Sequence, residues 1–132
     1  MAVTWKQIPF IEDLDGSINF VIDGGGSAIT TGVKGDIEIG FDCIITACRV
    51  LPDQSGSIVV DIWKDTYANY PPTDADTITS STPPTVTATT KSEDTTLTSW
   101  TTTISAGDIL RFNVDSVTTI ERVTISLTVE RS

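Results

Sequence analysis

Apolar and polar residues alternate with a period of two in several segments of the chain, which is typical of β-strands. The clearest case is the last quarter, residues 100–130, where Leu110, Phe112 and Val114 share one face before a short polar turn. The same period continues after the turn through residues 123–129. This pattern predicts a closing β-hairpin of an all-β domain. Because only one side of each strand is apolar, a second sheet must cover it, which favours a sandwich.

Four earlier segments are also predicted to be strands, namely residues 17–23, 36–41, 43–51 and 57–65. Residues 43–51 are apolar on both faces, which predicts a central strand. Residues 57–65 are also expected to form an inner strand, with its two faces formed by Ile58, Val60 and Ile62 and by Val59, Asp61 and Trp63. Residues 66–90 contain two Pro-Pro pairs. They are therefore predicted to be a long surface excursion with at most short edge strands.

These segments predict seven or eight strands and no amphipathic helix, hence an antiparallel β-sandwich of jelly-roll type. An immunoglobulin-like sandwich shares this alternation, so the strand order stays open. A length of 132 residues suits one domain. We expect the sandwich over residues 17–132 and an attachment arm over residues 1–16. Apolar side chains on such an arm, here Trp5, Phe10 and Ile11, usually dock on another surface.

The two cysteines, Cys43 and Cys48, lie five positions apart in one expected strand. An odd separation in a regular strand points side chains to opposite faces, so the two thiols should not pair with each other. We expect both to be small buried or half-buried residues.

The formal net charge is −10, from 18 acidic and 8 basic residues. This charge opposes contact with phosphate backbones and anionic lipids, so nucleic acid and membrane surfaces are not expected partners. No apolar run approaches the roughly 20 residues of a membrane-spanning helix. No secretory signal is visible at the start, and we expect the chain to be made in the cytoplasm.

Catalytic chemistry has few candidates, because the sequence contains no histidine. Ser-His and Cys-His nucleophile pairs and histidine-based metal sites are therefore excluded. A carboxylate pair for glycoside hydrolysis could come from Asp61 with Asp65, or from residues 74 and 76, which are also aspartates. Such residues more often cap turns, and we expect no enzymatic activity.

A calcium ion is the other ligand that the sequence brings into question. Asp13 and Asp15 stand in a segment that resembles the first part of a calcium loop, but the later oxygen positions and the closing glutamate are missing. A local turn explains the segment, and we expect no cofactor.

Carbohydrate binding would use exposed aromatic faces beside polar groups. The available rings are Trp63, Tyr67, Tyr70 and Trp100. Tyr67 and Tyr70 flank Asn69 in an expected loop, so these three residues are candidate contacts for a receptor or glycan. The favoured alternative is that the two tryptophans fill the core and that the tyrosines close one end of the sandwich or an interface.

Three stretches carry a family resemblance, namely residues 22–35, 51–72 and 104–116. The middle one, which includes SGSIVVDIWKDTYANYPP, is the most distinctive. In these stretches the chain resembles a β-sandwich module of tailed-bacteriophage virion proteins, found in tail-fibre, head-fibre and other capsid-surface proteins. The resemblance covers roughly residue 17 to the C-terminus. It implies a virion component, a homotrimer displayed on the particle surface, and it brings no catalytic residues and no defined receptor.

The resemblance thus predicts a non-enzymatic structural protein of the virion surface. Only sixteen residues precede the module, so a fibre shaft is not expected. The arm would then attach the module to a capsid or tail protein, as in a decoration or short-spike protein. Three-fold packing would use apolar outward positions such as Val21, Ile45 and Val59. The alternative is a receptor- or carbohydrate-binding module used in host adsorption.

Overall fold

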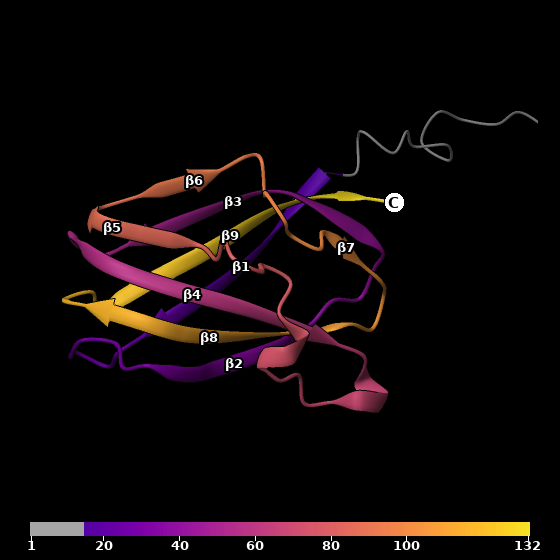
Figure 1. Cartoon of the computed structure of the whole chain (residues 1–132), viewed down its shortest axis with the longest axis horizontal. Helices are drawn as coiled ribbons and strands as arrows, with labels where there is room; N and C mark the ends of the chain where they lie inside the picture. Colours follow the sequence, from indigo (N-terminus) through magenta and orange to yellow (C-terminus); the bar gives the residue numbers. More distant parts are fainter. Residues whose placement is uncertain (1–14) are drawn as a thin grey trace, which may run out of the picture.

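A computed structural model describes residues 15–132, which form two antiparallel β-sheets and almost no helix (Figure 1). The all-β class predicted from the sequence is confirmed, and the two layers are consistent with a β-sandwich. Trp5, Phe10, Ile11 and Asp13 lie outside the described residues, and so does nearly all of the expected attachment arm.

The first sheet has the order β1 (Asp15–Asp23), β9 (Arg122–Arg131), β3 (Cys43–Pro52), β6 (Ser92–Asp94), and β7 (Thr103–Ile104) also pairs with β3. The second sheet has the order β2 (Gly32–Glu38), β8 (Ile109–Thr118), β4 (Gly56–Asp65), β5 (Thr85–Thr89). Residues 15–132 thus hold nine strands where the sequence predicts seven or eight. β6 and β7 span only three and two residues, too few for a periodic pattern to be visible.

The core lies between the two sheets, where the apolar positions of the alternating strands meet. Ile58, Val60 and Ile62 of β4 are completely buried, as the alternation predicts. Phe112 of β8 is also completely buried and stacks on Phe20 of β1, with ring centroids 4.3 Å apart. This stack joins the two sheets through side chains alone, because β1 and β8 belong to different sheets.

The predicted closing hairpin is wrong, although both of its strands exist. β8 pairs with β2 and β4, whereas β9 pairs with β1 and β3 in the opposite sheet. The connection between them passes from one sheet to the other. In this connection Ile120 is completely buried, and Thr119 has a left-handed backbone conformation with φ 62°. In both arrangements the apolar faces point to one core, so alternation alone does not distinguish a hairpin from a crossing between sheets.

The expected opposite orientation of the two cysteines is also wrong. The pairing of β3 with β9 shifts register between Ile45 and Ala47, and such a bulge adds one residue to the strand. Cys43 and Cys48 therefore both face the core. Both thiols are free, so the prediction that the two cysteines do not pair is confirmed. Burial raises the pKa of Cys48 to about 12. The bulge also buries Ile45, which was expected to point outward, and leaves Ile44 exposed instead.

The strand expected over residues 36–41 begins and ends earlier, as β2. Glycines 32 and 35 belong to this strand. Gly35 lies under the Phe20 ring, and a Cβ there would stand 2.9 Å from its Cζ atom. Ile39 follows the strand and is still buried against the core.

The excursion expected over residues 66–90 contains two 3₁₀ turns, η3 (Tyr67–Asn69) and η4 (Asp74–Asp76), followed by the edge strand β5. In Figure 1 this segment leaves the end of β4 and folds back beside the second sheet. Thr77 forms a bridge with Trp63, which fixes the returning segment on β4. No helix in the described part of the chain is long and apolar enough to cross a membrane.

Candidate functional site: a groove on the second sheet

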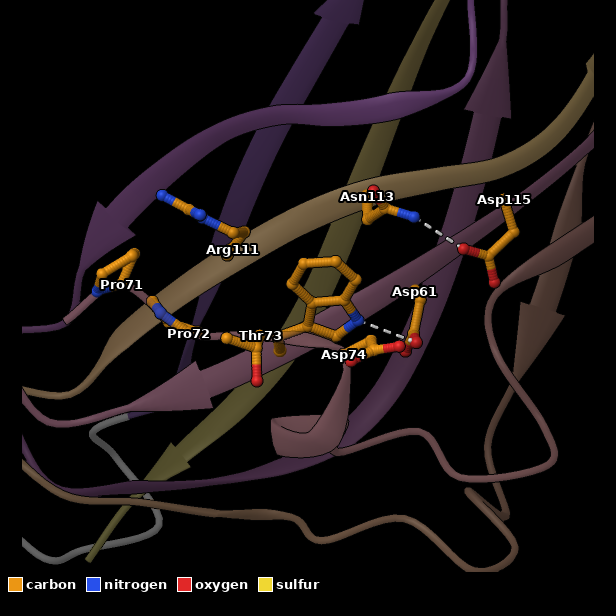
Figure 2. A pocket seen from close by; sticks show the side chains of 9 residues that line it. Asp61, Pro71, Pro72, Thr73, Asp74, Arg111, Asn113 and Asp115 are labelled. Carbon is orange, nitrogen blue, oxygen red and sulfur yellow. Dashed lines mark hydrogen bonds between the residues drawn. The ribbon is translucent and has the colours of Figure 1, made fainter. Parts of the chain in front are cut away.

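A groove of about 670 Å³ lies between the outer face of the second sheet and the segment that follows β4. Its lining residues come from β4, from β8 and from residues 71–74, and are Asp61, Trp63, Pro71, Pro72, Thr73, Asp74, Arg111, Asn113 and Asp115. Figure 2 shows Arg111 and Asn113 on one strand, with Pro71, Pro72 and Thr73 on the neighbouring loop.

Strand alternation builds the floor of this groove. Asp61 and Trp63 alternate with buried Ile62 on β4, so their side chains leave the outer face. The register of the two strands places Trp63 opposite Arg111 and Asp61 opposite Asn113. Two cross-strand pairs thus form one continuous surface of an aromatic ring, a cation, an amide and a carboxylate.

Asp61 is the structural centre of the floor. Its Oδ1 accepts hydrogen bonds from the backbone N–H of Ile62 (2.8 Å) and the hydroxyls of Thr77 (2.6 Å) and Thr79 (2.7 Å). Its Oδ2 accepts from the indole Nε1 of Trp63 at 2.9 Å. These four bonds fix the indole plane and fasten the returning segment to β4.

The other carboxylates of the suggested glycosidase pairs serve nearby turns. Asp65 Oδ1 accepts hydrogen bonds from the backbone N–H of Thr66 and the side-chain amide of Asn69. Asp76 Oδ2 accepts from the backbone N–H of Thr73, which closes the turn η4. Asp74 lines the groove and accepts no side-chain hydrogen bond within residues 15–132.

Arg111 forms one end of the groove and is held by a carboxylate behind it. Its Nε and Nη2 donate to the two oxygens of Asp36 at 2.7 and 2.9 Å, which is a bidentate pair. The Tyr70 hydroxyl donates to Asp36 at 2.8 Å, and the guanidinium lies 5.5 Å from the centre of the Tyr70 ring. The hydrogen bond from Arg111 lowers the pKa of Asp36.

The Asp36–Arg111 pair predicts an acid-dependent loss of stability. Because the pKa of Asp36 is lower in the folded state, its contribution is complete above about pH 4 and is lost as the pH falls through the folded pKa. Since both side chains are partly exposed, we expect Asp36→Asn to cost only about 1–2 kcal/mol at pH 7. Urea titrations from pH 7 to pH 2.5 should show that the difference from wild type is constant down to about pH 5 and shrinks below pH 4. A difference that stays constant to pH 2.5 would contradict the assignment.

The three residues that the sequence suggests as ligand contacts lie together at the turn η3, and none of them lines the groove. Tyr67 is 77% exposed and does not line the groove, and neither does Asn69, which is bound to Asp65. Tyr70 does not line the groove either, although its hydroxyl accepts a hydrogen bond from Arg111, which does. Sequence reasoning missed Arg111 and Asn113, although their outward position on β8 follows from the alternation around Phe112.

The expectation for the tryptophans holds for one of the two. Trp100 packs against the core and donates its indole N–H to the carbonyl of Thr82 at 2.8 Å. Trp63 is half-buried on the outer face and is not part of the core. The sequence signal was present, because Trp63 shares a strand face with Asp61 rather than with Ile62.

No group of three or more histidine, cysteine, aspartate or glutamate side chains in residues 15–132 is arranged to hold a metal ion. Asp15, from the segment that resembles a calcium loop, is the first residue of β1 and stands opposite Glu130 of β9.

Comparison of the sequence with known protein-family models and with curated proteins gave no match.

Proposed function

We propose that this chain is a non-enzymatic structural module of a bacteriophage particle, displayed on the head or tail surface, and that its fold is a jelly roll. The observation that carries the proposal is the set of strand pairs. With the two-residue β7 set aside, β1 pairs with β9, β2 with β8, β3 with β6 and β4 with β5, all antiparallel. First pairs with last and the pairing proceeds inward, as in a long hairpin rolled into two sheets.

This nested pairing favours a jelly roll over the immunoglobulin-like alternative. An immunoglobulin-like sandwich places its second strand beside the first and the fifth in one sheet. Here β2 lies in the opposite sheet from β1. Jelly rolls are typical of viral capsid and lectin domains, which agrees with the virion resemblance. The net charge of −10 also suits a surface that should not bind the packaged genome.

The test of this role is the composition of the particle. Particles of the phage that encodes this chain, purified from a lysate of its host, should contain the chain in a fixed copy number. Quantitative mass spectrometry measures this number. An antibody against the module should bind intact particles, because the module is displayed outside. Particles that lack the chain, while the infected cell contains it, would overturn the proposal.

The homotrimer implied by the resemblance has a candidate contact surface on the outer face of the first sheet. Val21 and Leu51 both stand opposite Thr124 of the central strand β9, so the three form one row across the sheet. Val21 is 55% exposed and Leu51 is 45% exposed. Val59, the other position expected to serve packing, is half-buried between β8 and β5.

We expect Leu51→Arg to convert the isolated protein from a trimer to a monomer, which reduces its mass in solution threefold, because the substitution would bury a charge in the contact between subunits. Size-exclusion chromatography with light scattering measures this mass. Val33→Arg is the matched control, since Val33 has a similar exposed fraction of 46% but belongs to the second sheet. A wild-type monomer at every concentration, or equal dissociation by both variants, would exclude this contact surface.

A second candidate function is binding of a receptor or glycan during host adsorption. The groove over Trp63 favours it, because an aromatic, a cationic and several acidic side chains converge there on an open surface. The isolated protein should then compete with phage particles for the host cell and slow adsorption. Adsorption unaffected by an excess of the protein would count against this role.

A further inference from the structure

We propose that the groove on the second sheet is a binding site for a neutral carbohydrate, with the Trp63 ring as its stacking platform. Arg111, Asn113, Asp74 and Asp115 would supply the hydrogen bonds to the sugar hydroxyls. This inference deepens the second function proposed above and rests on it for its biological meaning.

The indole of Trp63 has the properties of a stacking platform. Its only polar atom, Nε1, is already bound to Asp61, so the ring offers a fixed apolar face rather than a hydrogen-bond donor. The ring is half-buried and lines the groove. The C–H groups on one face of a sugar ring carry partial positive charge and are attracted to the negative face of an aromatic ring.

The rim offers donors and acceptors at the spacing of neighbouring side chains on one strand. Asn113 Nδ2 donates to Asp115 Oδ1 at 2.7 Å, which leaves the amide oxygen and the second carboxylate oxygen as acceptors (Figure 2). Arg111 uses Nε and Nη2 for Asp36 and Tyr70, so its Nη1 can donate to a ligand. A sugar hydroxyl both donates and accepts, and such a mixed rim satisfies both requirements.

The charge of the groove selects against acidic ligands. Three lining carboxylates, those of Asp61, Asp74 and Asp115, stand against one guanidinium, which Asp36 already neutralises. Phosphate, sulfate and sialic acid groups would meet a negative surface on a chain of net charge −10. A neutral sugar requires no compensating charge.

The site is also preformed. Asp61 holds the Trp63 ring through one hydrogen bond and fastens Thr77 and Thr79, which follow the lining loop, through two others. Asp36 holds Arg111 through a bidentate pair. Little side-chain ordering would remain to be done when a ligand binds. The volume of about 670 Å³ lies within the range of about 300–1,000 Å³ that is common for small-ligand sites.

The test begins with the purified full-length protein on an array of glucose, galactose and N-acetylglucosamine oligosaccharides, beside sialylated and sulfated forms. The best neutral oligosaccharide is then titrated by calorimetry. Trp63→Ala should weaken its affinity at least tenfold, and Trp63→Phe should weaken it less, because a smaller ring remains. Asn113→Ala should also weaken it. Tyr67→Ala is the matched control, an exposed ring outside the groove, and should leave the affinity unchanged.

Salt distinguishes this ligand class from a cationic one, such as a lysine-rich peptide. Neutral-sugar binding should change less than twofold between 0.05 and 0.5 M NaCl, whereas binding of a cation to the carboxylates should be strongly screened. The inference would be overturned if the protein bound no neutral glycan, or if salt removed the binding. It would also be overturned if Tyr67→Ala lost affinity while the folded variants Trp63→Phe and Asn113→Ala kept it. The adsorption experiment stands apart, because competition for host cells without neutral-glycan binding would keep the binding role and reject only the ligand class.

Discussion

Replacing Phe112 by alanine is expected to lower the free energy of unfolding by about 3–5 kcal/mol. Phe112 is completely buried in β8, and its ring lies parallel to that of Phe20 at an interplanar angle of 4°. The substitution removes this contact between the two sheets and leaves a cavity beside Phe20 that the two packed layers cannot fully close. Since a domain of this size is stable by about 5–15 kcal/mol, the loss is a large share of the total.

Urea denaturation followed by circular dichroism measures this cost. Phe112→Leu is the matched control, because it keeps most of the side-chain volume and should cost less than half as much. Phe20→Ala and the double variant complete a cycle, in which the stacked pair should show a coupling of about 0.5–1.5 kcal/mol. A cost below about 1 kcal/mol for Phe112→Ala would show that the ring does not fill the space between the sheets.

The sequence could predict which face of each strand is buried, because that depends only on neighbouring residues. Ile58, Val60 and Ile62 are buried as their alternation predicts. It could not predict which sheet each strand joins, since pairing is decided by contacts far apart in the chain. β8 and β9 illustrate this limit, because their patterns fit a hairpin equally well but the strands lie in opposite sheets.

A single extra residue in β3 made the predicted side-chain orientations of this strand wrong beyond it. The bulge between Ile45 and Ala47 inverts the orientation of every residue on one side of it, relative to a regular strand. Nothing in the composition of residues 43–51 marks the position of the bulge. The predicted orientations of Cys48 and of Ile45, which was expected to serve subunit packing, were therefore wrong. Ile45, expected to point outward, is therefore buried, and the exposed apolar side chains of β3 are Ile44 and Leu51.

In the candidate site, too, some features could be predicted from the sequence and others could not. The outward direction of Asp61 and Trp63 could be derived from strand alternation, whereas the return of residues 71–74 over them depends on tertiary contacts. Loop position and aromatic character pointed instead to Tyr67, which is the more exposed ring. Exposure alone does not gather polar groups around a ring, and the groove forms where two strands and a loop meet.

Replacing Asp61 by alanine is expected to cost on the order of 3 kcal/mol and to abolish ligand binding in the groove. The substitution leaves four donors without their acceptor, and one of them, the Thr79 hydroxyl, belongs to a residue with no exposed surface. The same carboxylate also orients the Trp63 ring, so stability and binding should be lost together.

Asp61→Asn separates these two roles. An asparagine whose oxygen replaces Oδ1 keeps the three bonds to Ile62, Thr77 and Thr79, so we expect a cost of only about 1 kcal/mol. Its amide nitrogen then faces the Trp63 indole N–H, and two donors cannot bond, so the ring loses its fixed orientation. Urea denaturation and glycan titration of the two variants measure stability and affinity independently. If Asp61→Asn kept full affinity for the neutral oligosaccharide, the carboxylate would serve only to fasten residues 77–79 to β4, and the ring would owe its position to packing alone.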